Sequence, residues 1–238
     1  MSCLGLPRPG GERAQVAFPS GSRQTKKHPG DAPMIVGYHL IMTAYGFWLP
    51  NDPRGSWSKF VGAWDLFEAG GRATRDKVTE RRSYAKDAHD RERRLATKGA
   101  LLYPPVRFNG LQARAVARGF GAFIKKSGLK AWACAVMSDH VHLAIARHHY
   151  DIEQVAVKLK QAATLRLNEE DIHPLKQHIK PNGRHPPCFA RGEWKGFLDP
   201  NDVAPCIHYV EQNPVKAGLH SQVGMWEFVT PPEMGDSL

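Results

Sequence analysis

Apolar positions along the chain follow two periods, and the shorter one predicts β-strands. Runs of apolar, β-branched and aromatic residues predict a buried strand over 35–49. Two further strands are expected at 131–137 and 140–146, because only two residues separate them, as in a tight hairpin. A short strand or turn is expected at 192–199.

The longer period predicts three amphipathic helices. Apolar residues recur at intervals of three and four over 111–129, 152–167 and 202–213. Asp202 is suited to cap the third helix, and Pro214 disfavours helical geometry at the residue before it, so this helix should end there. The resulting order of elements is typical of an α+β fold, with a mostly antiparallel sheet and helices packed on it.

The 238 residues divide into one expected domain and flanking segments. Residues 1–33 are rich in Pro, Gly, Ser and Arg, which indicates a disordered tail or an upstream start-site artefact. A single domain is expected over 34–230, with a charged insertion at 50–105 and a C-terminal tail at 231–238. The insertion should be partly helical and exposed to solvent.

The formal net charge of +10 is unevenly distributed. Residues 34–150 carry 19 Lys or Arg against 9 Asp or Glu, whereas 151–238 carry 9 against 12. Such a field attracts polyanions, of which nucleic acid is the commonest. The charged stretch 72–98 is either a solvated helix face or a contact to a DNA backbone.

Apolar runs and cysteines indicate the compartment. No run reaches the ~18–20 apolar residues of a membrane helix, and the N-terminus lacks the apolar core of a signal peptide. The four cysteines show no CxxC and no regular spacing, which is typical of free thiols in a reducing cytoplasm.

The first candidate for chemistry is the pair His140 and His142. Alternation along a strand places both on one face, roughly 6.5–7 Å apart, where two imidazoles can converge on one divalent metal. The alternative is a pair of partly exposed strand histidines without a ligand.

The second candidate is the pair Tyr209 and Asn213. Tyr209 lies beside the apolar stripe of its helix and Asn213 follows one turn later, so a phenol and an amide share one helix edge. A tyrosine nucleophile would split a phosphodiester exchange into two steps, but a phenol with pKa near 10 must first be activated. A half-buried helix tyrosine with a packing role is the alternative.

These segments resemble a known family. SDHVHLAI is similar to the His-x-His strand of the HUH single-strand nucleases. YVEQNPVKAGL resembles the tyrosine-helix signature of the REP-associated tyrosine transposases, and GEWKGFLD resembles the segment that precedes that helix. The resemblance covers 111–228 well and 34–49 loosely.

The resemblance implies a ferredoxin-like fold and a set of roles. His140 and His142 would ligate Mg²⁺ or Mn²⁺, and Asn213 would complete or support the metal site. Tyr209 would attack single-stranded DNA near a hairpin, join the 5′ phosphate and release a free 3′-OH. The sequence therefore predicts a metal-dependent tyrosine transposase or single-strand DNA nuclease, cytoplasmic and associated with the nucleoid.

Basic residues are expected to hold the DNA backbone, among them Arg114, Lys125, Lys126 and Lys216. The chain is expected to be a monomer or a homodimer. Two rival functions stay open: a non-catalytic, domesticated transposase that only binds nucleic acid, and a metal-dependent hydrolase that forms no covalent intermediate.

Overall fold

A four-stranded antiparallel sheet is the centre of the fold. The computed structural model describes residues 34–49, 69 and 91–232. The strands are β1 (Gly37–Thr43), β2 (Ala131–Val136), β3 (His140–Ala146) and β4 (Trp194–Leu198). They pair in the order β2-β3-β1-β4, with every neighbouring pair antiparallel.

Two helical crossovers connect the strands. Helix α3 (Gly110–Ser127) joins β1 to β2, and α4 (Ile152–Glu169) joins β3 to β4. Each crossover skips one strand, so the chain is an interleaved pair of βαβ units, which is the ferredoxin-like arrangement. The predicted α+β fold class is confirmed.

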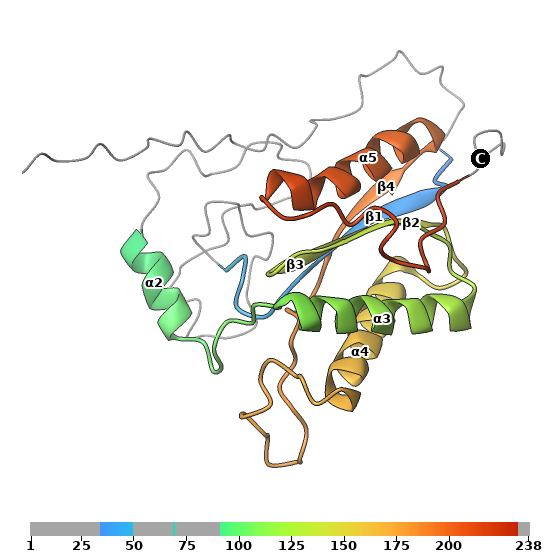
Figure 1. Ribbon diagram of the computed structural model, residues 1–238. Helices are drawn as coiled ribbons and strands as arrows, with labels where there is room; N and C mark the ends of the chain where they lie inside the picture. Colours follow the sequence, from blue (N-terminus) through green and yellow to red (C-terminus); the bar gives the residue numbers. More distant parts are fainter. Residues whose placement is uncertain (1–33, 50–68, 70–90, 233–238) are drawn as a thin grey trace, which may run out of the picture.

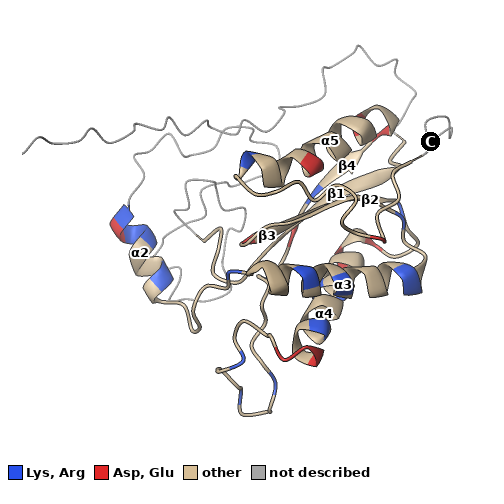
Figure 2. Cartoon of the chain, viewed as in Figure 1, with Lys and Arg blue, Asp and Glu red and all other residues tan. Residues whose placement is uncertain are grey.

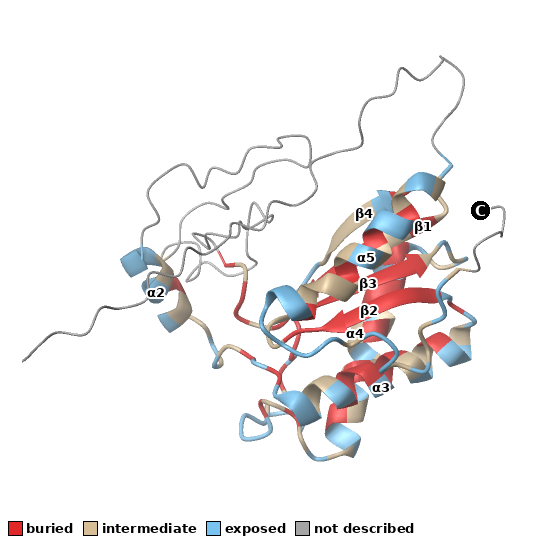
Figure 3. Ribbon diagram, turned by 45° about the horizontal axis from the view of Figure 1, so that its top comes forward, coloured by how far each residue is buried: buried red, intermediate tan, exposed pale blue. Residues whose placement is uncertain are grey.

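The sheet separates two layers of helices. Helices α3 and α4 cover one face, and α5 (Pro200–Lys216) covers the other (Figure 1). The larger apolar core lies between the sheet and α3/α4, and a smaller one lies under α5. The inner five residues of the central strand β3 are all buried, so the centre of the sheet is closed on both faces (Figure 3).

Close approach of α3 to α4 depends on a glycine. A Cβ added at Gly119 would lie 2.6 Å from the backbone oxygen of Ala162, nearer than real Cβ atoms come to other atoms. The predicted end of α3 is also confirmed, because Gly128 adopts the left-handed φ of 71° that glycine tolerates best.

Three predicted boundaries are wrong. The first strand ends at Thr43 instead of reaching residue 49, because Tyr45 and Gly46 form a turn in which Gly46 has a φ of 84°. Helix α5 runs from Pro200 to Lys216 and is longer than predicted at both ends.

The start of α5 is capped by Asp199, not Asp202. The Asp199 carboxylate accepts bonds from the backbone N–H groups of Asn201 and Asp202, and Pro200 occupies the first turn, where its missing N–H costs nothing. At the other end the helix continues through Pro214 to Lys216. The side-chain amide of Asn213 donates to the Tyr209 carbonyl at 2.7 Å, one residue before the Val210 carbonyl that would pair with an N–H at position 214.

The expected segments outside the sheet are described only in part. The predictions for 1–33 and for most of 50–90 and 231–238 lie outside the described residues. Within the insertion, α2 (Arg91–Gly99) is a short helix with several basic side chains, mostly exposed, as the charge pattern predicted (Figure 2). None of the described helices has the length and apolar character needed to cross a bilayer.

The C-terminal segment covers the outer edge of β2. The side-chain amide of Gln222 bonds to both the N–H and the carbonyl of Val136, at 2.9 Å each. Thr230 donates its N–H to Ala131, and the Trp226 indole donates to Cys134. These contacts satisfy backbone groups that an edge strand would otherwise expose.

Candidate active site

Strand β3 presents both predicted histidines on the α5 face of the sheet. Val141, Leu143 and Ile145 alternate with them and are fully buried in the core against α3 and α4. The two imidazole rings are perpendicular, with centroids 4.8 Å apart. The His140 Nδ1 lies 2.6 Å from the Asp139 carboxylate, which accepts its proton.

A third histidine, His39, joins this pair from β1. Its Nε2 lies 3.0 Å from the Nδ1 of His142, and the two rings stack at an angle of 21°. The antiparallel register places His39 opposite Ala144, one side-chain position along the same face from His142. The sequence interpretation missed His39; its signal was a single imidazole inside the apolar run of β1.

Helix α5 places Tyr209 over these rings. Val203, Cys206 and Val210 pack against the sheet, and the strands carry small residues beneath them, Ala133, Ala135 and Ala144. Small side chains let a helix approach a sheet closely. The Tyr209 ring accordingly lies 5.6 Å from the His39 ring and 5.7 Å from the His142 ring, between centroids.

Two further residues of α5 lie next to Tyr209. Asn213 follows it by one turn and donates to its backbone carbonyl. The Lys216 Nζ lies 5.6 Å from the centre of the Tyr209 ring. Lys216 is exposed, so its ammonium group lies on the solvent side of the Tyr209 ring.

Two tryptophans border the cluster. The Trp194 ring meets His39 edge-on at 5.3 Å, and the Trp48 ring lies 6.0 Å from His140. Gly196 on β4 leaves room for Trp194, whose ring would lie 3.0 Å from a Cβ at that position.

Burial keeps the inner part of the cluster neutral. It lowers the pKa of His39 to about 4. Burial, together with the neighbouring His140 and His39, lowers the pKa of His142 well below its usual value. Burial raises the pKa of the Tyr209 phenol, although the Asn213 amide opposes this shift. At neutral pH His39 and His142 are therefore neutral and the Tyr209 phenol is protonated.

The donor atoms of the histidine pair are suited to a divalent metal. Each Nδ1 already has a partner, Asp139 for His140 and His39 for His142, which leaves the two Nε2 atoms as the available ligands. Metal-bound histidines characteristically bond through the other ring nitrogen in this way. Among the described residues, no group of three or more His, Cys, Asp or Glu side chains is arranged around one ion.

The predicted DNA-binding residues are divided between the two faces. Lys216 lies beside Tyr209, as noted above. Arg114, Lys125 and Lys126 are exposed on α3, which covers the opposite face of the sheet (Figure 2). The fold therefore does not bring these three cations together with Tyr209.

Fold and site define an α+β, ferredoxin-like domain with an imidazole–phenol cluster under one helix. Among solved structures, the chain is similar to a REP-associated tyrosine transposase bound to a REP hairpin, at 12% identity and a TM-score of 0.41, covering 85% of this chain and 81% of that chain. It is also similar to a protein from Deinococcus radiodurans R1 assigned as a transposase, at 17% identity and a TM-score of 0.33, covering 79% and 96%.

Both TM-scores are low, so the fold assignment rests on the strand order and register described above. No protein-family model matches the chain, and no curated protein sequence matches it.

Proposed function

We propose that the protein is a transposase-like enzyme that cleaves and transfers single-stranded DNA through a covalent bond to Tyr209. The observation that supports this most directly is the position of the Tyr209 ring, within 6 Å of two imidazoles that come from separate strands. A tyrosine with only a packing role would not require buried, neutral histidines beneath it, because burying polar rings costs free energy.

The proposed reaction exchanges one phosphodiester bond for another. The Tyr209 Oη attacks the scissile phosphorus, the bond from phosphorus to the 3′ oxygen breaks, and a 5′-phosphotyrosine forms. The phenol must lose its proton in this step, and the departing 3′ oxygen must gain one. Burial raises the pKa of Tyr209, so the phenol is protonated before the reaction begins.

The residues around Tyr209 have separate roles in this proposal. His140, His142 and Asn213 would hold Mg²⁺ or Mn²⁺. Such a cation, when bound, makes the phosphorus more electrophilic. Lys216 would attract the phosphate backbone to the exposed side of the phenol.

The decisive experiment traps the covalent intermediate. The full-length chain is incubated with Mg²⁺ and hairpin DNA that carries a single-stranded flank, labelled at either the 5′ or the 3′ end. A 5′-phosphotyrosine retains the strand downstream of the cut, so the 3′ label should migrate with the protein on a denaturing gel. The 5′ label should appear on a released fragment that ends in a 3′-OH.

Variants of two tyrosines separate the proposal from its rivals. Tyr209→Phe should abolish the adduct, whereas Tyr150→Phe, at the other end of β3 beside His148, should leave it unchanged. Cleavage that survives Tyr209→Phe would indicate a hydrolase without a covalent intermediate. Salt-sensitive binding with no cleavage on any such hairpin would indicate the non-catalytic, DNA-binding alternative.

A further inference from the structure

His39 contacts a proposed metal ligand through the ring nitrogen that this ligand would not offer to the ion. Its Nε2 is directed at the Nδ1 of His142, which is not the nitrogen that His142 would offer to a metal. His39 therefore acts on the site through His142.

One proton lies between these two nitrogens, and its position decides what His142 can bind. If His39 donates to the His142 Nδ1, the single N–H proton of neutral His142 is on Nε2, and that nitrogen has no lone pair for a metal. If His142 donates through Nδ1, its Nε2 lone pair is available. We propose that His39 is a positioning residue. Its Nε2 accepts a hydrogen bond from the Nδ1–H of His142, which leaves the lone pair of the His142 Nε2 available to a divalent cation.

The second histidine of the pair shows the same arrangement with a different acceptor. The Asp139 carboxylate lies 2.6 Å from the His140 Nδ1 and can only accept when ionised, so the His140 proton is on Nδ1. Both Nε2 atoms must carry lone pairs if the two rings serve one ion. His142 therefore needs a hydrogen-bond acceptor at its Nδ1, as Asp139 is for His140. His39 occupies that position.

The surroundings of His39 hold its ring in place. The side chain is 8% exposed and stacks on His142, while Trp194 packs edge-on against it at 5.3 Å. Its cross-strand partners on β3 and β4 are Ala144 and Gly196, which are small enough to leave the ring room on this face. A ring fixed on both sides supplies an acceptor of defined direction.

Metal affinity measures this role without DNA or turnover. Mn²⁺ binding to the full-length chain is followed by electron paramagnetic resonance or calorimetry. His39→Leu removes the acceptor and should weaken Mn²⁺ binding by about 10–100-fold. His39→Gln places an amide oxygen near the former Nε2 and should keep most of the affinity, which a purely space-filling role would not predict.

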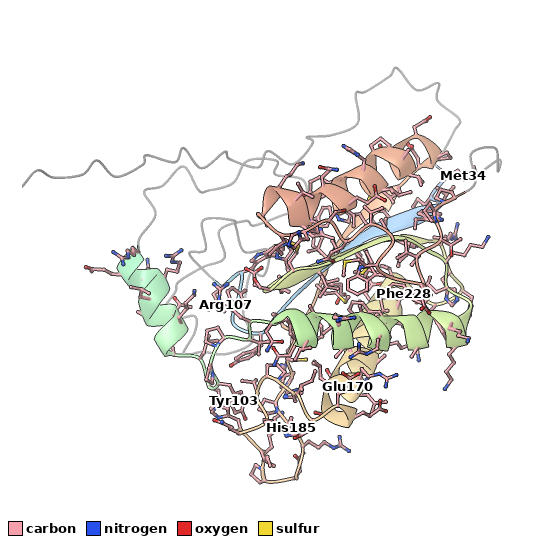
Figure 4. The ribbon with its side chains drawn as sticks, viewed as in Figure 1. Met34, Tyr103, Arg107, Glu170, His185 and Phe228 are labelled. Atoms are coloured by element: carbon pink, nitrogen blue, oxygen red, sulfur yellow. The ribbon has the colours of Figure 1, made fainter. Side chains whose placement is uncertain are left out.

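A buried histidine elsewhere provides the matched control. His173 is 2% exposed and stacks on His185, which lies by the end of α4 on the side of the sheet away from α5 (Figure 4). His173→Leu should leave Mn²⁺ binding unchanged. Equal loss in His39→Gln and His39→Leu, or no loss in a folded His39→Leu variant, overturns the proposal.

The tautomer can also be read directly in the metal-free wild type, so the test does not depend on a variant that folds. Long-range ¹H–¹⁵N correlation spectra should show His142 protonated at Nδ1 and unprotonated at Nε2. The opposite tautomer overturns the proposal. The inference rests on the proposed function only for the use to which the bound metal is put. If no DNA adduct forms but the tautomer and the Mn²⁺ affinities are as expected, the tyrosine chemistry is wrong and the role of His39 is retained.

Discussion

The two faces of the sheet differ in the kind of side chain they bury. The face toward α3 and α4 carries large apolar groups such as Leu40, Met42 and Leu143, which pack against Phe120. The face toward α5 buries three alanines, Trp132, Leu198 and the imidazoles of His39 and His142. Period-two alternation along the strands therefore assigns most apolar packing to one face and the candidate chemistry to the other.

The difference has an energetic consequence. Burying large apolar side chains stabilises the fold, whereas burying imidazoles costs free energy unless they are hydrogen-bonded. The larger core can offset the cost of the smaller, polar one. Substitutions on the two faces should therefore affect different properties: folding on the α3/α4 side, and metal binding and adduct formation on the α5 side.

The largest effect on stability is expected from Phe120→Ala. Phe120 is fully buried, so its removal should lower the free energy of unfolding by about 3–5 kcal/mol, measured by urea denaturation. Mn²⁺ affinity below the unfolding transition should not change. Val210→Ala under α5 should cost only about 1.5 kcal/mol, because it removes two methyl groups. Equal losses at the two positions would contradict the division of the faces.

Acid should destabilise the metal-free protein by a smaller amount. His39 titrates near 4 when folded but near 6.5 when unfolded, so the unfolded state binds more protons between these values. The free energy of unfolding should fall as the pH drops from 6.5 to 4, by about 3 kcal/mol for this residue. It should be independent of His39 above that window.

The variant His39→Gln isolates this contribution. Burial also lowers the pKa of His173 to about 4, so part of the slope should persist in His39→Gln and be removed by His173→Gln instead. Urea denaturation at several pH values measures each share. An unchanged slope in His39→Gln would show that this ring is not buried neutral in the folded state.

Asp139→Asn should have the smallest effect. The amide can still accept the His140 Nδ1 proton but without the negative charge, and bonds to charged acceptors are roughly twice as strong. Mn²⁺ affinity should fall by about tenfold, with little change in the free energy of unfolding. Full affinity in Asp139→Asn would show that the charge at this position does not support His140.

Local patterns predicted most of the elements and three of the four rings of the cluster, all but His39. Alternation placed His140 and His142 together, and the helical stripe placed Tyr209 and Asn213 at one edge. The errors occurred where local rules compete. Asp199 and Asp202 both suit a helix cap, and α5 continues through Pro214 to Lys216 although proline disfavours helical geometry at the residue before it.

The sequence by itself determined which residues share a face, because strand and helix periods depend only on neighbours in the chain. Only the tertiary structure decided that β1 lies beside β3, in a register that joins His39 to His142 across 103 positions. It also decided that α5 covers the histidine face while α3 carries its cations on the other. These contacts follow from the strand order and from which helix covers which face. Both depend on how the whole chain buries its apolar residues, not on neighbours in the sequence.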